Sequence, residues 1–156
     1  MVNAPYEAAE VERILTKLEG PLAGEVALLH LTDMVARLRA VAPMPISLGD
    51  TIGKSTPDTV GRMLEAVAGV VPVAELAGHF HDTGGMALRN IEVALDLGLR
   101  AFDTAVGGLG GCPYAPGAPG NVATEAVLDL MTARGFTTGV DAAVIAKAAD
   151  LARGMR

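Results

Sequence analysis

The feature that most constrains the fold of this chain is a repeated order of short apolar segment, polar loop and amphipathic helix. Segments at 45–50, 76–81 and 99–106 have the length and residue types of strands, and a loop containing glycine follows each one. Helical spacing of apolar residues resumes after the first two loops, at 60–67 and 86–97. Strands that alternate with helices of this length imply parallel pairing and right-handed crossovers, so the sequence predicts an α/β fold.

Further helices are expected outside these units. Apolar residues recur at helical spacing over 7–18, 25–41, about 121–134 and 141–153. On this basis we divide the chain into a divergent helical amino-terminal segment, residues 1–45, and an α/β part, residues 46–156. Within the α/β part, Ser55-Thr-Pro-Asp58 offers a capping residue followed by proline, which favours a helix start there.

The length of 156 residues limits the architecture. A complete barrel of eight βα units typically needs about 250 residues. Three units form either an open sheet or one part of a barrel whose remaining strands lie elsewhere. In both arrangements, the loops that follow the carboxyl ends of the strands are where such folds place their chemistry.

Composition excludes several classes of partner. Apolar residues make up 51% of the chain, which is too much for a generally disordered protein. The 18 acidic and 12 basic residues give a net charge of -6, so no nucleic acid partner is expected. No apolar run approaches the roughly 18 residues that cross a bilayer, so no membrane partner is expected either. One cysteine cannot form an internal disulfide and no leader is recognised, which favours a cytoplasmic location.

The triplet His79-Phe80-His81 carries the strongest local signal for chemistry. Residues i and i+2 of a strand point to the same face, so the two imidazoles can bind one ion. The alternative is that the histidines only form hydrogen bonds at the end of a strand. Their position at the carboxyl end of a predicted parallel strand, directly before Asp82, favours a metal site.

Carboxylates occupy similar places on the two neighbouring strands. Asp50 lies at the end of the first strand, where it can transfer protons or orient a metal-bound water. It can equally cap the following loop by accepting hydrogen bonds from backbone N–H groups. Asp103 lies in the third strand, where alternation directs it either towards a pocket or into a structural hydrogen bond.

The longest irregular segment, 107–121, contains the single thiol of the chain, Cys112. Four glycines precede Cys112, so the loop could close over a ligand and deliver the sulfur as an acid or base. The alternative is a phosphate-binding glycine loop, although the spacing fits neither a P-loop nor a Rossmann turn. Asn121 and Glu125 are one helical turn apart in the predicted next helix, so both are expected to reach the same face. Asn121 can also cap that helix.

Four segments together resemble the carboxyl-terminal half of the hydroxymethylglutaryl-CoA lyase family. They are 46–53, 79–83, 108–115 and 120–125. The likeness extends over about residues 46–140, and its specific element is the glycine-rich loop that contains Cys-Pro-Tyr. The H-x-H pair is shared by a wider superfamily of metal-dependent barrel lyases, Claisen-type synthases and carboxyltransferase domains.

This resemblance implies a partial (β/α)8 TIM barrel, in which the three strands are the sixth, seventh and eighth, with Mg²⁺ or Mn²⁺ at the carboxyl face. It implies a lyase that cleaves 3-hydroxy-3-methylglutaryl-CoA, an acyl-CoA substrate, to acetyl-CoA and acetoacetate. The matched positions are, as metal ligands, His79, His81 and Asn121 and, as catalytic groups, Asp50, Cys112 and Glu125.

One part of the family pattern has no counterpart in this sequence. The first strand of the family supplies an Arg-Asp pair, and nothing before Ile46 resembles it. The sequence therefore predicts that part of the active site is missing. Another acyl-CoA substrate, or a catalytically silent half-barrel that pairs with another chain, are alternative interpretations. Three parallel strands leave two unpaired edges, so a homo-oligomer or a complementing chain is expected.

Overall fold

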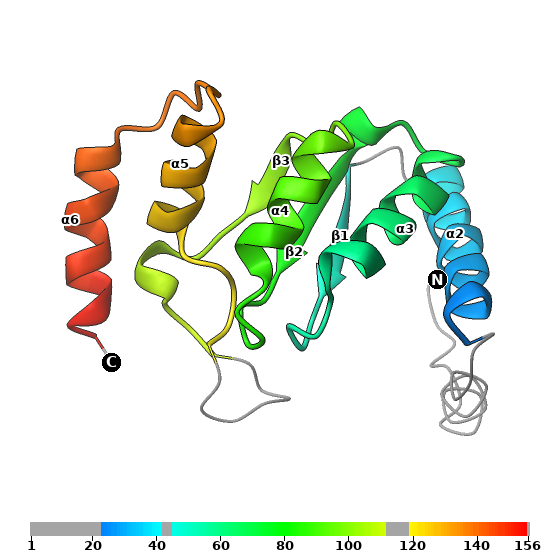
Figure 1. The fold of residues 1–156 in the computed structure, drawn as a ribbon, viewed down its shortest axis with the longest axis horizontal. Coiled ribbons are helices and arrows are strands. Elements are labelled where there is room, and N and C mark those ends of the chain that lie inside the picture. Colours follow the sequence, from blue (N-terminus) through cyan, green and yellow to red (C-terminus); the bar gives the residue numbers. More distant parts are fainter. Residues whose placement is uncertain (1–22, 42–44, 112–118, 156) are drawn as a thin grey trace.

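The computed structural model describes residues 23–41, 45–111 and 119–155 (Figure 1). The predicted helix at 7–18 lies outside the described residues, so the division of the chain at residue 45 remains a prediction. In chain order the elements are α2 (Ala23–Val41), β1 (Ile46–Asp50), α3 (Pro57–Ala68), the 3₁₀ turn η1 (Val73–Glu75), β2 (Leu76–Phe80), α4 (Ala87–Asp96), β3 (Ala101–Asp103), the 3₁₀ turn η2 (Val106–Gly108), α5 (Thr124–Ala133) and α6 (Ala142–Arg153).

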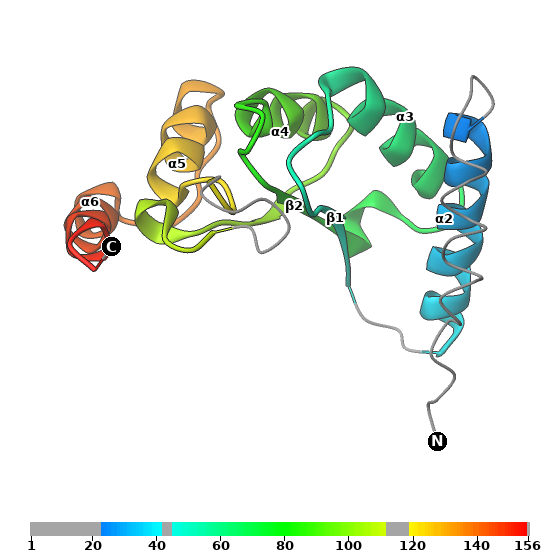
Figure 2. The same ribbon diagram turned by 90° about the horizontal axis from the view of Figure 1, so that it is seen from below.

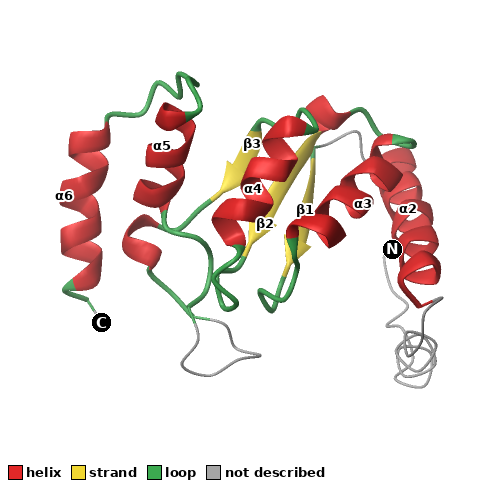
Figure 3. Ribbon diagram, in the orientation of Figure 1, coloured by secondary structure: helices red, strands yellow, loops and turns green. Residues whose placement is uncertain are grey.

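The three strands form one parallel sheet in the order β1-β2-β3 (Figure 3). Each strand is connected to the next by a helix, α3 after β1 and α4 after β2. His79 of β2 is in register with Gly49 of β1 on one side and with Asp103 of β3 on the other. The predicted α/β fold with parallel strands is confirmed.

Helices α3 and α4 cover one face of this sheet (Figure 2). Alternate residues of β2 point into the core beneath them, where Leu76 is 2% and Phe80 is 1% exposed. The intervening residue His79 belongs to the opposite face. On that face Ser47 of β1 and Asp103 of β3 are exposed in the described part of the chain. The sheet thus has an apolar side towards the helices and a more polar, open side.

The start of α3 agrees with the sequence prediction. Thr56 is the N-cap, and its hydroxyl accepts a hydrogen bond from the backbone N–H of Thr59, while Pro57 occupies the first helical position. The Thr59 hydroxyl in turn accepts a hydrogen bond from the Thr56 N–H at 2.8 Å, which completes a capping box. The buried residues of the helix are Val60, Leu64 and Val67, as its apolar spacing predicts.

The third strand is shorter than the prediction of 99–106, because β3 spans only three residues. Leu99 is fully buried before the strand begins, and its N–H closes the end of α4 by donating to the Ala94 carbonyl at 2.9 Å. Beyond the strand, Ala105 pairs with Ala123 in an isolated bridge, and the chain then turns at Gly107, whose φ is 65°. The residues after 103 therefore pair with a later segment and not with β2.

The predicted helix start at Asn121 is also wrong, because α5 begins at Thr124. The segment before it is extended and bonded to the ends of the strands. The Val122 N–H donates to the Phe80 carbonyl at 3.0 Å, and the Ala105 N–H donates to the Val122 carbonyl at 2.9 Å. This pairing attaches Asn121 to the carboxyl end of β2.

The remaining helices lie close to the predicted ranges. Helix α2 matches the expected 25–41 within two residues, and α6 begins after Asp141, whose carboxylate accepts hydrogen bonds from two N–H groups of the first turn. Helix α6 packs against η2 so closely that a Cβ at Gly107 would lie 2.9 Å from the Ala149 carbonyl oxygen. No helix among the described residues is both long and apolar enough to cross a membrane.

Candidate functional site

The carboxyl ends of β2 and β3 bring His79, His81, Asp103 and Asn121 together. The strand register places Asp103 beside His79, and an isolated antiparallel bridge places Asn121 beside His81. The Asp82 N–H donates to the Gly120 carbonyl at 2.9 Å, which extends this attachment. Three residues predicted as metal ligands therefore meet at one end of the sheet. His79 lies in β2, His81 directly follows it, and Asn121 lies in the segment before α5.

Asp103 is the residue that joins these groups. Its Oδ1 lies 2.5 Å from Nδ1 of His79 and accepts a hydrogen bond from Nδ2 of Asn121 at 2.6 Å. The Ser47 hydroxyl lies 3.5 Å from the other carboxylate oxygen. The side chains of His79 and Asp103 are 30% and 52% exposed, so the cluster is open to solvent on one side. The sequence leaves two roles open for Asp103, a place facing a pocket or a structural hydrogen bond, and the structure shows the hydrogen bond.

His79 and His81 present their rings on the same side of the strand, as the spacing predicts. Their ring centroids are 4.8 Å apart and the ring planes meet at 62°. Nδ1 of His81 is buried and has no hydrogen-bond partner among the described residues. A buried polar atom without a partner is costly, so this nitrogen marks a place where a bound group would be stabilising.

These residues fit a divalent cation. The Nδ1 of His79 is bound to Asp103, which leaves Nε2 for a metal. The Asn121 Oδ1 accepts the Val122 N–H at 2.9 Å and retains a second lone pair. In the part of the chain that the structure describes, no three His, Cys, Asp or Glu side chains are grouped to hold an ion. A site with three ligands here requires the amide of Asn121 beside the two histidines.

Asp50 lies at the end of β1 and is 9% exposed. Its Oδ1 accepts a hydrogen bond from the Lys54 N–H at 3.1 Å, and its Oδ2 accepts one from the Ser55 N–H at 3.0 Å. Capping of the loop after β1, one of its two predicted roles, is therefore observed. The catalytic role remains a prediction.

Asn90 of α4 supports the same loop and was not identified from the sequence. It is fully buried, its amide nitrogen donates to the Ser55 carbonyl at 3.0 Å, and its Oδ1 has no hydrogen-bond partner among the described residues. The sequence pattern that could have identified Asn90 is a polar side chain among the buried positions of α4, three residues after Ala87 and next to Ile91.

Glu125 and Asn121 have different hydrogen-bond partners among the described residues, and the expectation that both reach one face stays a prediction. Its Oε2 accepts the Gly107 N–H at 3.0 Å, and its Oε1 accepts a hydrogen bond from Arg153 at 2.7 Å. Burial alone would raise the pKa of Glu125, but N–H donors from Glu125 and Gly107 and the Arg153 guanidinium outweigh it, so this pKa lies below the ordinary 4.5. The carboxylate links the η2 turn, α5 and the end of α6.

The predicted catalytic thiol, Cys112, lies outside the described residues. The residues on either side of the undescribed segment 112–118 lie close to each other, because a Cβ at Gly120 would be 3.1 Å from the Gly111 carbonyl carbon. Since the Gly120 carbonyl accepts a hydrogen bond from the Asp82 N–H, Gly111 and Gly120 lie next to the histidine pair.

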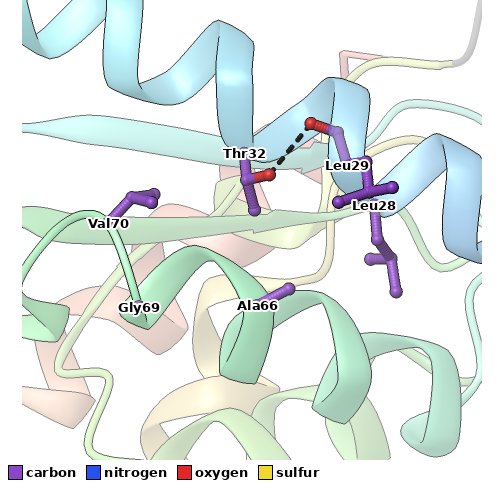
Figure 4. A pocket seen from close by; sticks show the side chains of 6 residues that line it. All are labelled: Leu28, Leu29, Thr32, Ala66, Gly69 and Val70. Atoms are coloured by element: carbon purple, nitrogen blue, oxygen red, sulfur yellow. Dashed lines mark hydrogen bonds between the residues drawn. The ribbon is translucent and has the colours of Figure 1, made fainter.

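A pocket of about 470 Å³ lies elsewhere, between α2 and α3 (Figure 4). Its lining has no titratable side chain, and its one hydroxyl, that of Thr32, donates to the carbonyl oxygen of Leu29 at 2.9 Å. The pocket therefore lacks the groups that acid-base or metal chemistry needs. It is lined by Leu28, Leu29, Thr32, Ala66, Gly69 and Val70.

Known proteins resemble this chain in both sequence and structure. A hydroxymethylglutaryl-CoA lyase of Pseudomonas mevalonii is 50% identical over 127 residues, which are 81% of this chain and 42% of that protein. A 3-hydroxy-3-isohexenylglutaryl-CoA/hydroxy-methylglutaryl-CoA lyase of Pseudomonas aeruginosa is 49% identical over 121 residues, which are 78% of this chain and 40% of that protein. The crystal structure of the HMG-CoA lyase from Brucella melitensis superposes with a TM-score of 0.78 at 50% identity, covering 80% of this chain and 44% of that one.

The chain spans about two fifths of the length of these relatives. Their fold is a TIM barrel, so the three-stranded parallel sheet corresponds to part of a (β/α)8 barrel, as the sequence predicts. The model of the HMGL-like family matches residues 6–152, nearly the whole sequence, and the chain therefore belongs to the HMGL-like family.

Proposed function

We propose that the chain contributes to a metal-dependent carbon–carbon lyase that cleaves 3-hydroxy-3-methylglutaryl-CoA to acetyl-CoA and acetoacetate. The observation that carries this proposal is the cluster of His79, Asp103 and Asn121 beside His81, whose buried Nδ1 has no hydrogen-bond partner among the described residues. Identity of 50% to a hydroxymethylglutaryl-CoA lyase supports the choice of reaction. The chain spans only about two fifths of that relative, so we propose this activity from the similarity and the site together.

A divalent cation would be held by His79, His81 and Asn121, and the family is in general dependent on such a metal. When bound, Mg²⁺ or Mn²⁺ would polarise the tertiary hydroxyl of the substrate and the carboxylate next to it. The three side chains lie at the carboxyl end of the sheet and are each partly buried. The carboxyl end is where barrels of parallel strands place their substrates.

Proton transfer would be carried out by the protein's own groups. We assign Asp50, at the carboxyl end of β1, as the base that takes the hydroxyl proton while the carbon–carbon bond breaks and acetoacetate forms. The electron pair of the broken bond remains on the acetyl-CoA carbon, and the thiol of Cys112 would donate a proton to it. Glu125, held by Gly107 and Arg153, would keep the glycine-rich turn in place at this site.

The proposed reaction also requires the Arg-Asp pair that the family resemblance implies on a different strand. Among the described residues, β1 and β3 each pair with a strand on one side only, which leaves two sheet edges. We propose that a second copy or a complementing chain, in the cytoplasm, covers these edges. The pair itself would come from a complementing chain, because this sequence has no counterpart of it. A cytoplasmic location remains a prediction.

A second candidate function is cleavage of a related acyl-CoA with a longer branch. The Pseudomonas aeruginosa relative at 49% identity carries 3-hydroxy-3-isohexenylglutaryl-CoA in its name, which favours this alternative over other members of the superfamily. Both reactions release acetyl-CoA and use the same proposed ligands. They differ only in the group attached to the tertiary carbon.

The test is release of acetyl-CoA from each of the two substrates by the purified 156-residue chain mixed with the missing part of a relative, which carries the Arg-Asp pair, in the presence of Mg²⁺ or Mn²⁺; the chain alone should release none. Activity should be lost in His81→Ala and retained in His30→Ala, a matched histidine on α2. Saturable Mn²⁺ binding should weaken in His81→Ala, and equal binding by wild type and a His79→Ala/His81→Ala variant would contradict the metal site. Metal binding without acetyl-CoA release, even after addition of the missing part of a relative, would favour the silent half-barrel.

A further inference from the structure

We propose that Asp103 is a positioning residue that sets His79 and Asn121 in the orientation needed to bind the cation before it arrives. The inference rests on the metal site of the proposed function. It adds a role for a residue that is not among the proposed ligands or proton-transfer groups. The role is to fix which nitrogen of the imidazole carries the proton, and which end of the amide faces the site.

The first support is that one oxygen serves two proposed ligands. Oδ1 of Asp103 is 2.5 Å from Nδ1 of His79 and 2.6 Å from Nδ2 of Asn121. Both nitrogens are thus within hydrogen-bond reach of the same carboxylate oxygen. Asp103 and His79 are in register on neighbouring strands, so the backbone of the sheet holds this pair together.

The second support is the direction of the hydrogen bond to His79. An ionised carboxylate only accepts, so Nδ1 of His79 must carry the proton. In a neutral imidazole, Nε2 then has a free lone pair, which is the form that binds a metal. An imidazole that donates its other N–H to a carboxylate is the usual arrangement at metal centres, and the carboxylate raises the basicity of the ligand nitrogen.

The third support comes from the other end of the Asn121 amide. Its nitrogen faces the acceptor Asp103, and its oxygen faces a donor, the Val122 N–H, at 2.9 Å. The two neighbours require the same orientation of the amide. Oδ1 of Asn121 is therefore the atom turned away from Asp103, and an amide oxygen is a suitable ligand for Mg²⁺ or Mn²⁺.

The competing explanation is an ordinary surface ion pair, because the Asp103 side chain is 52% exposed. Such pairs contribute little and do not determine a tautomer. The tautomer of His79 separates the two explanations. In the metal-free chain at about pH 8, where free imidazoles are neutral, long-range ¹H–¹⁵N correlation spectra report which ring nitrogen carries the proton. His79→Ala assigns the signal among the 3 histidines.

In wild type we expect the proton of His79 on Nδ1. Asp103→Ala should move a large part of the population to the Nε2–H form and weaken Mn²⁺ binding by about 10- to 100-fold. Asp103→Glu should restore part of the Nδ1–H population and part of the Mn²⁺ affinity. Asp129→Asn removes the same charge from an exposed position on α5 and should leave both unchanged. If Asp103→Ala does not fold, Asp103→Leu keeps the size of the side chain and removes both acceptors.

An unchanged His79 tautomer in the folded Asp103 variants would overturn the inference, whatever the Mn²⁺ result. A changed tautomer with unchanged Mn²⁺ affinity would also overturn it, because the orientation would then not serve the cation. If wild type shows no saturable Mn²⁺ binding, the metal site of the proposed function fails. The spectra would still decide separately whether Asp103 sets the imidazole.

Discussion

Gly78 lies in the middle of β2 on the face that packs against the core, where a side chain has no room. A Cβ added there would lie 2.6 Å from Cε2 of Phe80, 3.1 Å from Cδ1 of Phe102 and 3.2 Å from Cδ2 of Leu99. Carbon atoms in proteins prefer separations of about 3.5–4.0 Å. Phe80 and Leu99 are 1% and 0% exposed, so neither can move into solvent to make room.

We therefore predict that Gly78→Ala destabilises the fold. Overpacking a core costs about 1–3 kcal/mol, and the reduced freedom of the unfolded chain offsets about 0.4–1 kcal/mol of that. The free energy of unfolding should fall by up to about 2.6 kcal/mol. For a domain of this size, Tm should fall by up to roughly 10 °C.

The matched control is Gly49→Ala on the neighbouring strand. Gly49 is in register with His79, and its added Cβ would meet Cδ2 of His79 at an ordinary 3.6 Å. Urea unfolding followed by circular dichroism should place the midpoint of Gly78→Ala below wild type and that of Gly49→Ala at or above it. If the two alanine variants unfold at the same urea concentration, the argument from close packing at Gly78 is refuted.

Three further predictions concern the carboxylate of Glu125, the amide of Asn90 and the sheet edges. Because the pKa of Glu125 is lowered from 4.5, its contribution to stability is present above that value and is lost as the pH falls through the folded-state pKa. Wild type should accordingly lose more unfolding free energy than Glu125→Gln between about pH 6 and pH 3, and equal losses would contradict the pairing with Arg153. Asn90→Ala should lower the free energy of unfolding by about 1–3 kcal/mol, because the partly buried Ser55 carbonyl loses its donor at 3.0 Å. Urea titration measures this, and an unchanged midpoint would disprove it. Sedimentation velocity should find a dimer or larger species, since β1 and β3 leave open edges in the part of the chain that the structure describes, and a stable monodisperse monomer would refute that expectation.

Much of the fold was predictable because local patterns determine it. The capping segment before α3 and the alternation along β2 each required only neighbouring residues. The length of β3 was not predictable, because it depends on a partner about 20 residues further along the chain. Ala105 pairs with Ala123 and not with β2. No periodicity in 99–106 indicates that the pairing partner changes there.

The candidate site was likewise predictable only in part. The shared face of His79 and His81 follows from their spacing in the strand, and the structure places their ring centroids 4.8 Å apart. The role of Asp103 required the register between β2 and β3, which is a property of the pair of strands and not of one strand alone. The partner of Glu125 is Arg153, 28 residues away on another helix, so no local pattern indicated it.

The alternation of residues in β2 explains why the core and the candidate site can share one short strand. Leu76, Gly78 and Phe80 point towards α3 and α4, while His79 points to the open face. A shift of the strand by one residue would bury an imidazole under the helices and expose Phe80, so the apolar face fixes the register. The same register sets His79 opposite Asp103. The packing of the core is therefore what aligns the proposed ligand with the carboxylate that orients it.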